Sequence, residues 1–268
     1  MNQTIRLSIG MFTILPLAPR GEFRPTPKQI RGMILCAPVV GLLMGLGLAI
    51  GLFLIREGIT WLQGGEESLG INGLSALLTI GLLVLVTGGL HWDGLADTVD
   101  AMACRKDRPG ALEVMRRSDV GPLGVITVVI VLLIQIMALT VAVERGHATI
   151  AIMTGVIAGR LSAVWACRMH AARPDGQGSW VARSTNKLQA SIVTGASLLV
   201  PLLLIFLDNS ASLTFAVLGI MAIPAALVLA GLLQRWWVQR FGGITGDTLG
   251  AGIEICTATA LVIVALAP

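Results

Sequence analysis

Charged residues are scarce in this sequence. Only 13% of its 268 residues are Asp, Glu, Lys or Arg, which is about half the share found in soluble globular domains. Hydrophobic residues make up 55% of the chain, and the mean hydropathy is +0.84. A soluble all-α protein would need helices with a polar face, so this composition argues against that class.

Cysteine is also rare. The four cysteines (Cys36, Cys104, Cys167 and Cys256) are scattered without a Cys-x-x-Cys pair, which argues against a zinc site and against a disulfide framework. Residues 1–20 lack a small-x-small cleavage motif, so we interpret them as an interfacial segment rather than a signal peptide. Neither an internal repeat nor a low-complexity tract is evident, and we expect one domain over residues 1–268.

Long apolar runs are what the sequence has instead. Each is close to the roughly 20 residues that cross a bilayer as a helix. About seven occur: 37–55, 71–90, 123–143, 148–167, 188–207, 212–233 and 249–267. We therefore predict an all-α fold, a polytopic integral membrane helical bundle with about seven transmembrane helices. Gly41 and Gly45 fit the small-residue pattern through which membrane helices pack closely.

Basic residues alternate between the loops. They precede the first run and recur after the second, fourth and sixth runs, with few in the other loops. The positive-inside rule places the basic loops in the cytoplasm. We thus predict a multi-pass protein of the cell inner membrane with a cytoplasmic N-terminus. Because the unusual polar clusters lie on the same side, we expect an active site at the cytoplasmic face.

An acidic cluster directly follows the second apolar run. Asp93, Asp97 and Asp100 are spaced by four and three residues, which places them on one face of a helix. Like charges in this arrangement repel, and Mg²⁺ prefers such carboxylate oxygens. His91 is interpreted either as a general base or substrate contact beside the metal, or as a hydrogen-bonded interfacial residue.

A second acidic cluster lies in the glycine-rich segment 242–254. Gly243 and Gly246 allow a ligand to approach main-chain N–H groups, and the start of the following helix favours phosphate. Asp247 is either the N-cap of that helix or a metal or substrate ligand. Glu254 would share its helix face two turns into the membrane, where an ionisable group indicates function.

Three arginines are candidate phosphate ligands. Arg116 either contacts phosphate or only holds its loop inside, and Arg160 within an apolar run either contacts substrate or extends to the interface. Arg173 begins the loop 173–178, which is placed to close over a ligand. Together with the carboxylates, these residues predict a metal-dependent transferase acting on a phosphoanhydride at the membrane.

The segment Thr87–Asp100 (TGGLHWDGLADTVD) closely resembles the signature of the cobalamin synthase family, also called adenosylcobinamide-GDP ribazoletransferase. Further blocks agree in the same order, and the resemblance spans nearly the whole chain. These blocks are Met115-Arg116 with Ser118 and Gly121, Arg173 with Gly176 and Gly178, and Gly242-Gly243 with 245–251.

The resemblance implies an enzyme that joins adenosylcobinamide-GDP to α-ribazole or α-ribazole 5′-phosphate. The products would be adenosylcobalamin or its 5′-phosphate and GMP, with Mg²⁺ as cofactor. It implies metal ligation by Asp93, Asp97 and Asp247, with Asp100 and Glu254 in support. His91 or a carboxylate would accept the ribazole hydroxyl proton. Substrate contacts are expected from Arg116, Arg160, Arg173, Gly243 and Gly246. The expected partners are the two substrates, the lipid bilayer, and a second copy or other enzymes of the pathway, but not nucleic acid.

Two segments depart from the family pattern. The family usually has Asp-Ser-Arg where this chain has residues 117–119 as Arg-Ser-Asp, and Phe-Thr-Arg-x-Pro where residues 12–16 read FTILP. A CDP-alcohol phosphotransferase is the nearest rival, but its Asp-Gly-x-x-Ala-Arg motif is not matched at residues 93–98. A cation-coupled transporter would explain carboxylates near the membrane, but not their gathering at one face.

Overall fold

The computed structural model describes residues 3–17, 25–62, 64, 68–117, 119–208 and 212–268. Within these residues, seven helices are long and apolar enough to cross a membrane. They are α3 (Ala37–Leu62, extended at its start by α2, Pro27–Leu35), α4 (Leu69–Thr87), α7 (Pro122–Glu144), α8 (Ala148–Ala166), α10 (Lys187–Leu207), α11 (Leu213–Phe241) and α12 (Gly246–Leu266). The predicted polytopic all-α bundle is confirmed.

The other short helices lie at or near the ends of these spans. They are α1 (Gln3–Phe12), α5 (Leu90–Ala103), α6 (Arg108–Val114) and α9 (Gln177–Val181). The second predicted run is longer than the helix it forms, because α4 ends at Thr87. Gly88 and Gly89 follow with φ of 63° and 69°, a left-handed conformation that suits glycine. This break starts α5 as a separate helix.

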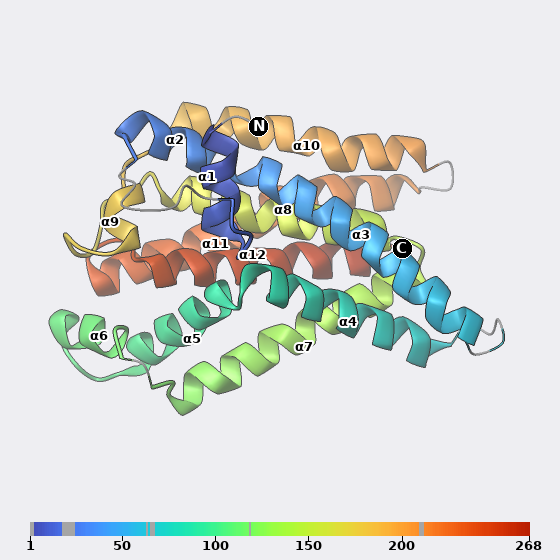
Figure 1. Cartoon of the computed structure of the whole chain (residues 1–268), viewed down its shortest axis with the longest axis horizontal. Helices are drawn as coiled ribbons and strands as arrows, with labels where there is room; N and C mark the ends of the chain where they lie inside the picture. Colours follow the sequence, from blue (N-terminus) through green and yellow to red (C-terminus); the bar gives the residue numbers. More distant parts are fainter. Residues whose placement is uncertain (1–2, 18–24, 63, 65–67, 118, 209–211) are drawn as a thin grey trace.

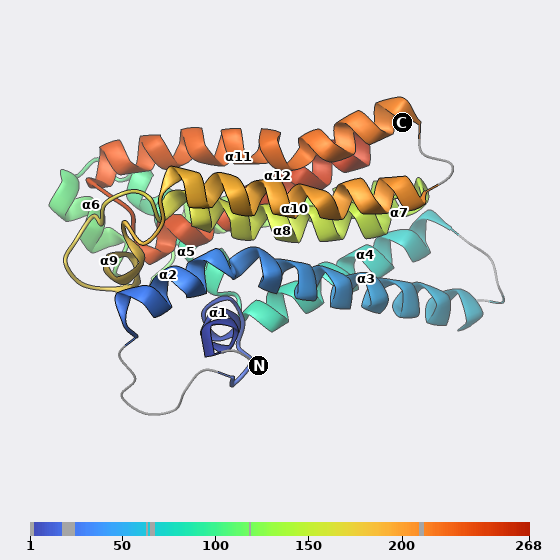
Figure 2. The ribbon, with the colours of Figure 1, turned by 90° about the horizontal axis from the view of Figure 1, so that it is seen from above.

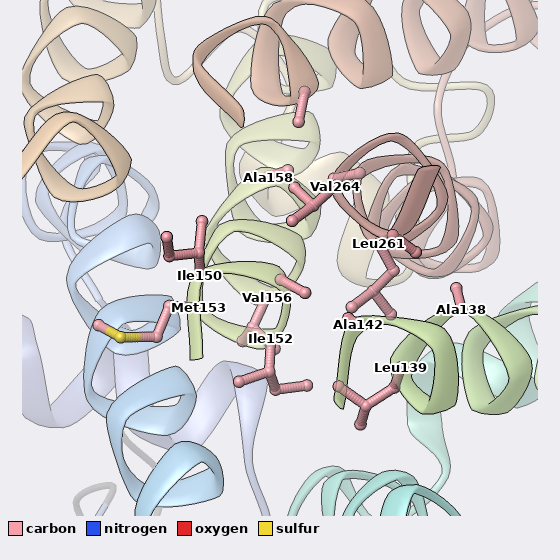
Figure 3. Packing of buried hydrophobic residues seen from close by; sticks show 14 of the residues in the cluster. Ala138, Leu139, Ala142, Ile150, Ile152, Met153, Val156, Ala158, Leu261 and Val264 are labelled. Carbon is pink, nitrogen blue, oxygen red and sulfur yellow. The ribbon is translucent and has the colours of Figure 1, made fainter. Parts of the chain in front are cut away.

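Two helices, α8 and α12, form the centre of the bundle (Figure 1). In their most apolar windows 83% and 72% of residues are buried, against at most 44% in the other spans. Figure 3 shows the apolar packing where both meet α7, with Leu139, Val156 and Leu261 among the buried side chains.

Glycine sets the distance between α3 and α8. A Cβ on Gly41 would lie 3.1 Å from the Cα of Ile157, and one on Gly45 would lie 3.0 Å from the Cα of Met153. Larger side chains would push the helices apart. The interpretation of this glycine pair as a packing motif is therefore confirmed.

The basic loops gather at one end of the bundle. Figures 1 and 2 show α6, α9 and the turn between α11 and α12 at this end, which we call the site end, and the C-terminus toward the other. The sequence predicted this grouping from the alternation of charge alone. Arg20 and Arg24, which contributed to that prediction, lie outside the described residues, as does Ser118.

Candidate active site at the junction of α5 and α12

The acidic face of α5 packs against the first turn of α12. A Cβ on Gly94 would lie 2.8 Å from the carbonyl oxygen of Asp247, and one on Gly250 would lie 3.0 Å from the Cα of His91. Both distances fall below ordinary van der Waals contact, so the two backbones approach this closely only because both residues are glycine. This contact brings the two predicted acidic clusters into one place.

A small cavity of about 50 Å³ lies at this junction. His91, Asp93, Gly246 and Asp247 line it, as the sequence predicted for one common site. Its other walls are Met11, Phe12, Leu90, Ala163, Gln177, Leu249, Gly250 and Ile253. The space is enough for an ion or one or two water molecules, so a large substrate must bind across its mouth.

The carboxylates act on one another electrostatically. The pKa of Asp97 is raised to about 7. Partial burial is the largest cause, and the negative charges of Asp93, Asp247 and Asp100 add to it. Such repulsion fits a site for a hard divalent cation, which is bound by oxygen ligands. Within the described residues, no three His, Cys, Asp or Glu side chains are close enough to hold a metal by themselves. The donor chemistry fits Mg²⁺, which commonly takes one or two carboxylates plus substrate phosphates and water.

Asp247 does not cap α12. The N-cap is Thr245, whose hydroxyl accepts a hydrogen bond from the backbone N–H of Thr248 in a capping box. The N-cap alternative for Asp247 is therefore wrong, and its carboxylate lies in the first turn, where the helix dipole favours negative charge. Its Oδ2 lies 3.6 Å from Nη2 of Arg173. Nη1 of Arg173 is buried without a hydrogen-bond partner in the described chain.

Asp100 has a different environment from the other two aspartates of α5. Its carboxylate accepts hydrogen bonds from the backbone N–H groups of Gly121 (2.6 Å) and Gly124 (2.9 Å). These groups belong to the start of α7, which has no side-chain cap of its own. Asp100 thus caps α7 from a neighbouring helix. It does not line the cavity, so the structure offers no contact for the supporting metal role predicted for it.

Glu254 and His91 meet beneath the cavity. Oε1 of Glu254 lies 3.5 Å from Nδ1 of His91, and Oε2 accepts a hydrogen bond of 2.9 Å from Nε2 of Gln135. Burial lowers the pKa of His91, which Glu254 partly opposes, so the imidazole is neutral near pH 7. The structure therefore places Glu254 beside a candidate base rather than beside the aspartates.

Arg160 lies in the interior of the bundle. It is 1% exposed, its Nη2 lies 3.5 Å from the sulfur of Met44, and Glu254 is within electrostatic reach. It is not among the residues that line the cavity. Glu254 thus acts on its charge electrostatically. These contacts test neither the substrate role nor the extension to the interface predicted from its sequence position.

Two loops enclose the junction at the site end. The segment 170–172 pairs with Ile244 through hydrogen bonds of 2.8 and 2.9 Å. A Cβ on Gly243 would lie 2.3 Å from the carbonyl carbon of Ala171, and one on Gly178 would lie 2.7 Å from the Cα of Thr245. Gly243, one of the two glycines predicted as substrate contacts, thus also allows the segment 170–172 to pack against the turn before α12, and Gly178 allows the loop 173–178 to pack against Thr245.

Arg116 lies on the surface beside this loop. Its Nη2 forms hydrogen bonds of 2.8 and 2.7 Å with the two carboxylate oxygens of Asp175, and both side chains are at least half exposed. An exposed pair of this kind contributes only about 0.2–1 kcal/mol. Separating Arg116 from Asp175 would therefore cost little.

Several residues of the site were not found from the sequence. Phe12 and Gln177 line the cavity, and Gln135 holds Glu254. They lie on segments remote from the acidic motifs, so only the packing of α1, α7 and α9 reveals them. The glycine that follows Asp93 was a usable signal for the junction with α12, because a glycine within a helix often marks the close approach of a second helix.

Comparisons with known proteins agree with the motifs. The family model described as cobalamin-5-phosphate synthase matches residues 4–265. The chain is 35% identical to the adenosylcobinamide-GDP ribazoletransferase of Frankia casuarinae, over 97% of this chain and 94% of that protein. Its identity to the proteins of the same name is 35% for Pseudomonas putida (97% and 98% covered) and 30% for Pseudomonas paraeruginosa (98% of both).

No solved structure matches this chain. The family model and the relatives nevertheless cover the α5 motif, the loop at 173–178 and the start of α12 in one continuous match. The candidate site therefore lies wholly within the matched region. This chain belongs to the cobalamin-5-phosphate synthase family, whose named relatives are enzymes.

Proposed function

We propose that this chain joins adenosylcobinamide-GDP to α-ribazole or α-ribazole 5′-phosphate and releases GMP, a late step of vitamin B12 synthesis. The relatives carry the name of this activity. The observation that supports it in this chain is the junction of α5 and α12, where carboxylates, a neutral histidine and an arginine line or border one cavity. Those groups suit attack of an alcohol on a phosphoanhydride.

In the proposed reaction a ribazole hydroxyl oxygen forms a bond to the phosphorus that bears cobinamide. The bond from that phosphorus to the oxygen of GMP breaks, and GMP leaves. The hydroxyl proton goes to His91, whose neutral imidazole lines the cavity. Nδ1 of His91 has no hydrogen-bond partner in the described chain, and Oε1 of Glu254 lies 3.5 Å from it. A hydrogen bond formed between them would leave Nε2 as the acceptor, in the manner of a carboxylate that positions a general base.

Arg173 is our candidate for the diphosphate oxygens. It already lies beside Asp247, and its buried Nη1 has no partner in the described chain. Unsatisfied buried donors are costly, and a phosphate oxygen would satisfy this one. Arg116 would join it after leaving Asp175.

Mg²⁺ bound by Asp93, Asp97 and Asp247 would neutralise charge on the diphosphate during transfer. The dipole at the start of α12 would also stabilise the negative charge of the diphosphate. The three carboxylates hold no fixed triad in the free chain. Substrate phosphate oxygens would therefore complete the ligand set, so nucleotide and metal should bind together.

The orientation follows from charge. The site end carries the basic loops, and the positive-inside rule turns that end toward the cytoplasm. We therefore propose an inner-membrane enzyme whose N-terminus and active site face the cytoplasm. Water-soluble nucleotide substrates would then reach the site without crossing the bilayer.

The test is GMP release by proteoliposomes that contain this chain, adenosylcobinamide-GDP and α-ribazole, with Mg²⁺ or with EDTA. We expect GMP only with Mg²⁺, together with a matching amount of cobalamin product. Asp93→Asn should insert normally but be inactive. Absence of turnover in folded, inserted protein would refute the proposal; release with CDP-alcohol substrates instead would favour the rival phosphotransferase class.

A further inference from the structure

A larger cavity, of about 400 Å³, lies outside the site described above, between α8, α10, α11 and α12. Its floor is hollowed by small residues, including Ala230, Gly231 and Gly252. Val228 and Leu232 line it and are 63% and 57% exposed on the flank of α11. In a membrane-embedded chain that flank contacts lipid, so the cavity is a groove that opens sideways into the bilayer.

Positive charge lies at one end of this groove. Arg168 and Arg235 both line it, and neither has an ion-pair partner in the described part of the chain. The guanidinium carbon of Arg168 lies 4.8 Å from the ring centre of Trp165, also in the lining, which holds the charge at the groove. None of the lining residues is acidic. The charge therefore favours an anionic ligand.

A buried amide lies next to these charges. Gln234 is 4% exposed and lines the groove, yet neither its Nε2 nor its Oε1 has a hydrogen-bond partner in the described chain. Both a donor and an acceptor are thus left unsatisfied, which costs free energy unless a ligand pairs with them. A purely hydrocarbon occupant would leave that cost in place.

The order of groups along α11 matches a phospholipid. From Arg235 the lining passes to Gln234 and then to Ala230, Leu227 and Pro224. The eleven helical steps from Arg235 to Pro224 span about 16 Å, close to the roughly 15 Å depth of hydrocarbon in one leaflet. With the charge at headgroup depth, the amide would lie just below it and the apolar lining would reach the middle of the bilayer.

We propose that this groove is a binding site for one anionic phospholipid of the leaflet at the site end. The phosphate lies between Arg168 and Arg235, the glycerol ester region pairs with Gln234, and one acyl chain follows the groove toward Pro224. Basic pockets between membrane helices recognise anionic headgroups in this way. The site rests on membrane insertion alone and is independent of the proposed transfer reaction.

Thr248 and Leu249 connect this groove to the catalytic junction. Both line the groove, and Leu249 also lines the small cavity beside Asp247. A lipid in the groove therefore supports the first turn of α12 from behind. We expect bound lipid to stabilise the folded protein, and we use binding rather than turnover as the test.

The experiment titrates the purified full-length chain in neutral detergent with phosphatidylglycerol or phosphatidylcholine, and counts bound lipids by native mass spectrometry. Phosphatidylglycerol should bind one site about tenfold more tightly than phosphatidylcholine. The double variant R168Q/R235Q should reduce this preference to within about twofold. The control R105Q/R117Q removes the same charge from exposed loop positions at the same end and should keep the preference. Gln234→Leu should weaken phosphatidylglycerol binding with both arginines present.

Equal binding of the two lipids by the natural sequence would overturn the proposal, as would equal losses in the two double variants. Displacement of phosphatidylglycerol by inorganic phosphate or by α-ribazole would also overturn it, because the groove would then serve a soluble ligand. If R168Q/R235Q does not fold, Arg235→Gln alone decides, since this side chain is exposed and its loss leaves the core unchanged.

Discussion

Replacing Gly94 with alanine should separate α5 from α12 without weakening either helix. The new Cβ would lie 2.8 Å from the carbonyl oxygen and 2.9 Å from the Cα of Asp247, where ordinary contact begins at 3.4 Å. These are backbone atoms that no rotamer can move, so the helices must part by roughly half an ångström or more. Alanine itself favours a helix over glycine by about 1 kcal/mol.

The expected consequence is a loss of catalysis in a folded protein. Misplacing reacting groups by about 1 Å can cost about a hundredfold in rate, so kcat/KM for GMP release should fall between about tenfold and a hundredfold. The assay is initial-rate GMP release in proteoliposomes, with the amount of inserted protein and its thermal unfolding measured in parallel.

A matched control is Gly47→Ala. Gly47 is also a helical glycine, but nothing lies within 4 Å of its added Cβ, so this variant should keep full activity. If Gly94→Ala is as active as Gly47→Ala, the close approach of α5 and α12 is not what assembles the site. If the Gly94→Ala variant is inactive because it fails to insert, the corresponding glycine of the facing helix, Gly250, offers a second test of the junction.

Four further results are expected. Asp97→Asn should lower GMP release at least a hundredfold with normal insertion, and a rate within twofold of the natural sequence would contradict its metal role. Arg173→Lys loses the planar fork, so KM for adenosylcobinamide-GDP should rise about tenfold while KM for α-ribazole stays constant; equal changes in both would contradict its place on the diphosphate. Glu254→Gln should lower kcat more than it changes either KM, because His91 loses its orienting charge. A change in thermal stability without a change in kcat would show that Glu254 is purely structural. Activity removed by EDTA should return with Mg²⁺ but not with Ca²⁺, whose larger, irregular coordination suits the site poorly; equal recovery with Ca²⁺ would argue against a Mg²⁺ site.

The sequence predicted the spans well, because a long apolar run is a local property. It also predicted that the polar clusters share one end, because the alternation of basic and non-basic loops shows which loops lie on the same side of the membrane. It did not predict the break after Thr87, where two left-handed glycines end a run that continues as apolar sequence through Leu90.

The partners of the acidic residues could not be read from spacing. Asp93, Asp97 and Asp100 do occur on one helix as predicted, yet Asp100 caps α7 because that helix begins with Gly121 and lacks its own cap. Spacing gives the face of a helix, but not which helix lies opposite. The cap of α12 was likewise missed, because Thr245 and Asp247 are both good capping residues and only the backbone decides between them.

Glu254 illustrates the same point inside the membrane. Its position within an apolar run predicted function, but its contacts with His91 and Gln135 come from helices far apart in the chain. The interior position of Arg160 is related, since its charge is balanced by Glu254 across two central helices. Such pairs are fixed by tertiary packing alone.

The most direct test of the account measures GMP and cobalamin product together, in proteoliposomes of the natural sequence and of Asp247→Asn. This variant keeps the cap at Thr245 and the size of the side chain, so α12 should remain in place. The account predicts equal amounts of both products from the natural sequence and neither from the folded variant. Full turnover by Asp247→Asn, or no GMP from the natural sequence with Mg²⁺ and both substrates, would contradict it.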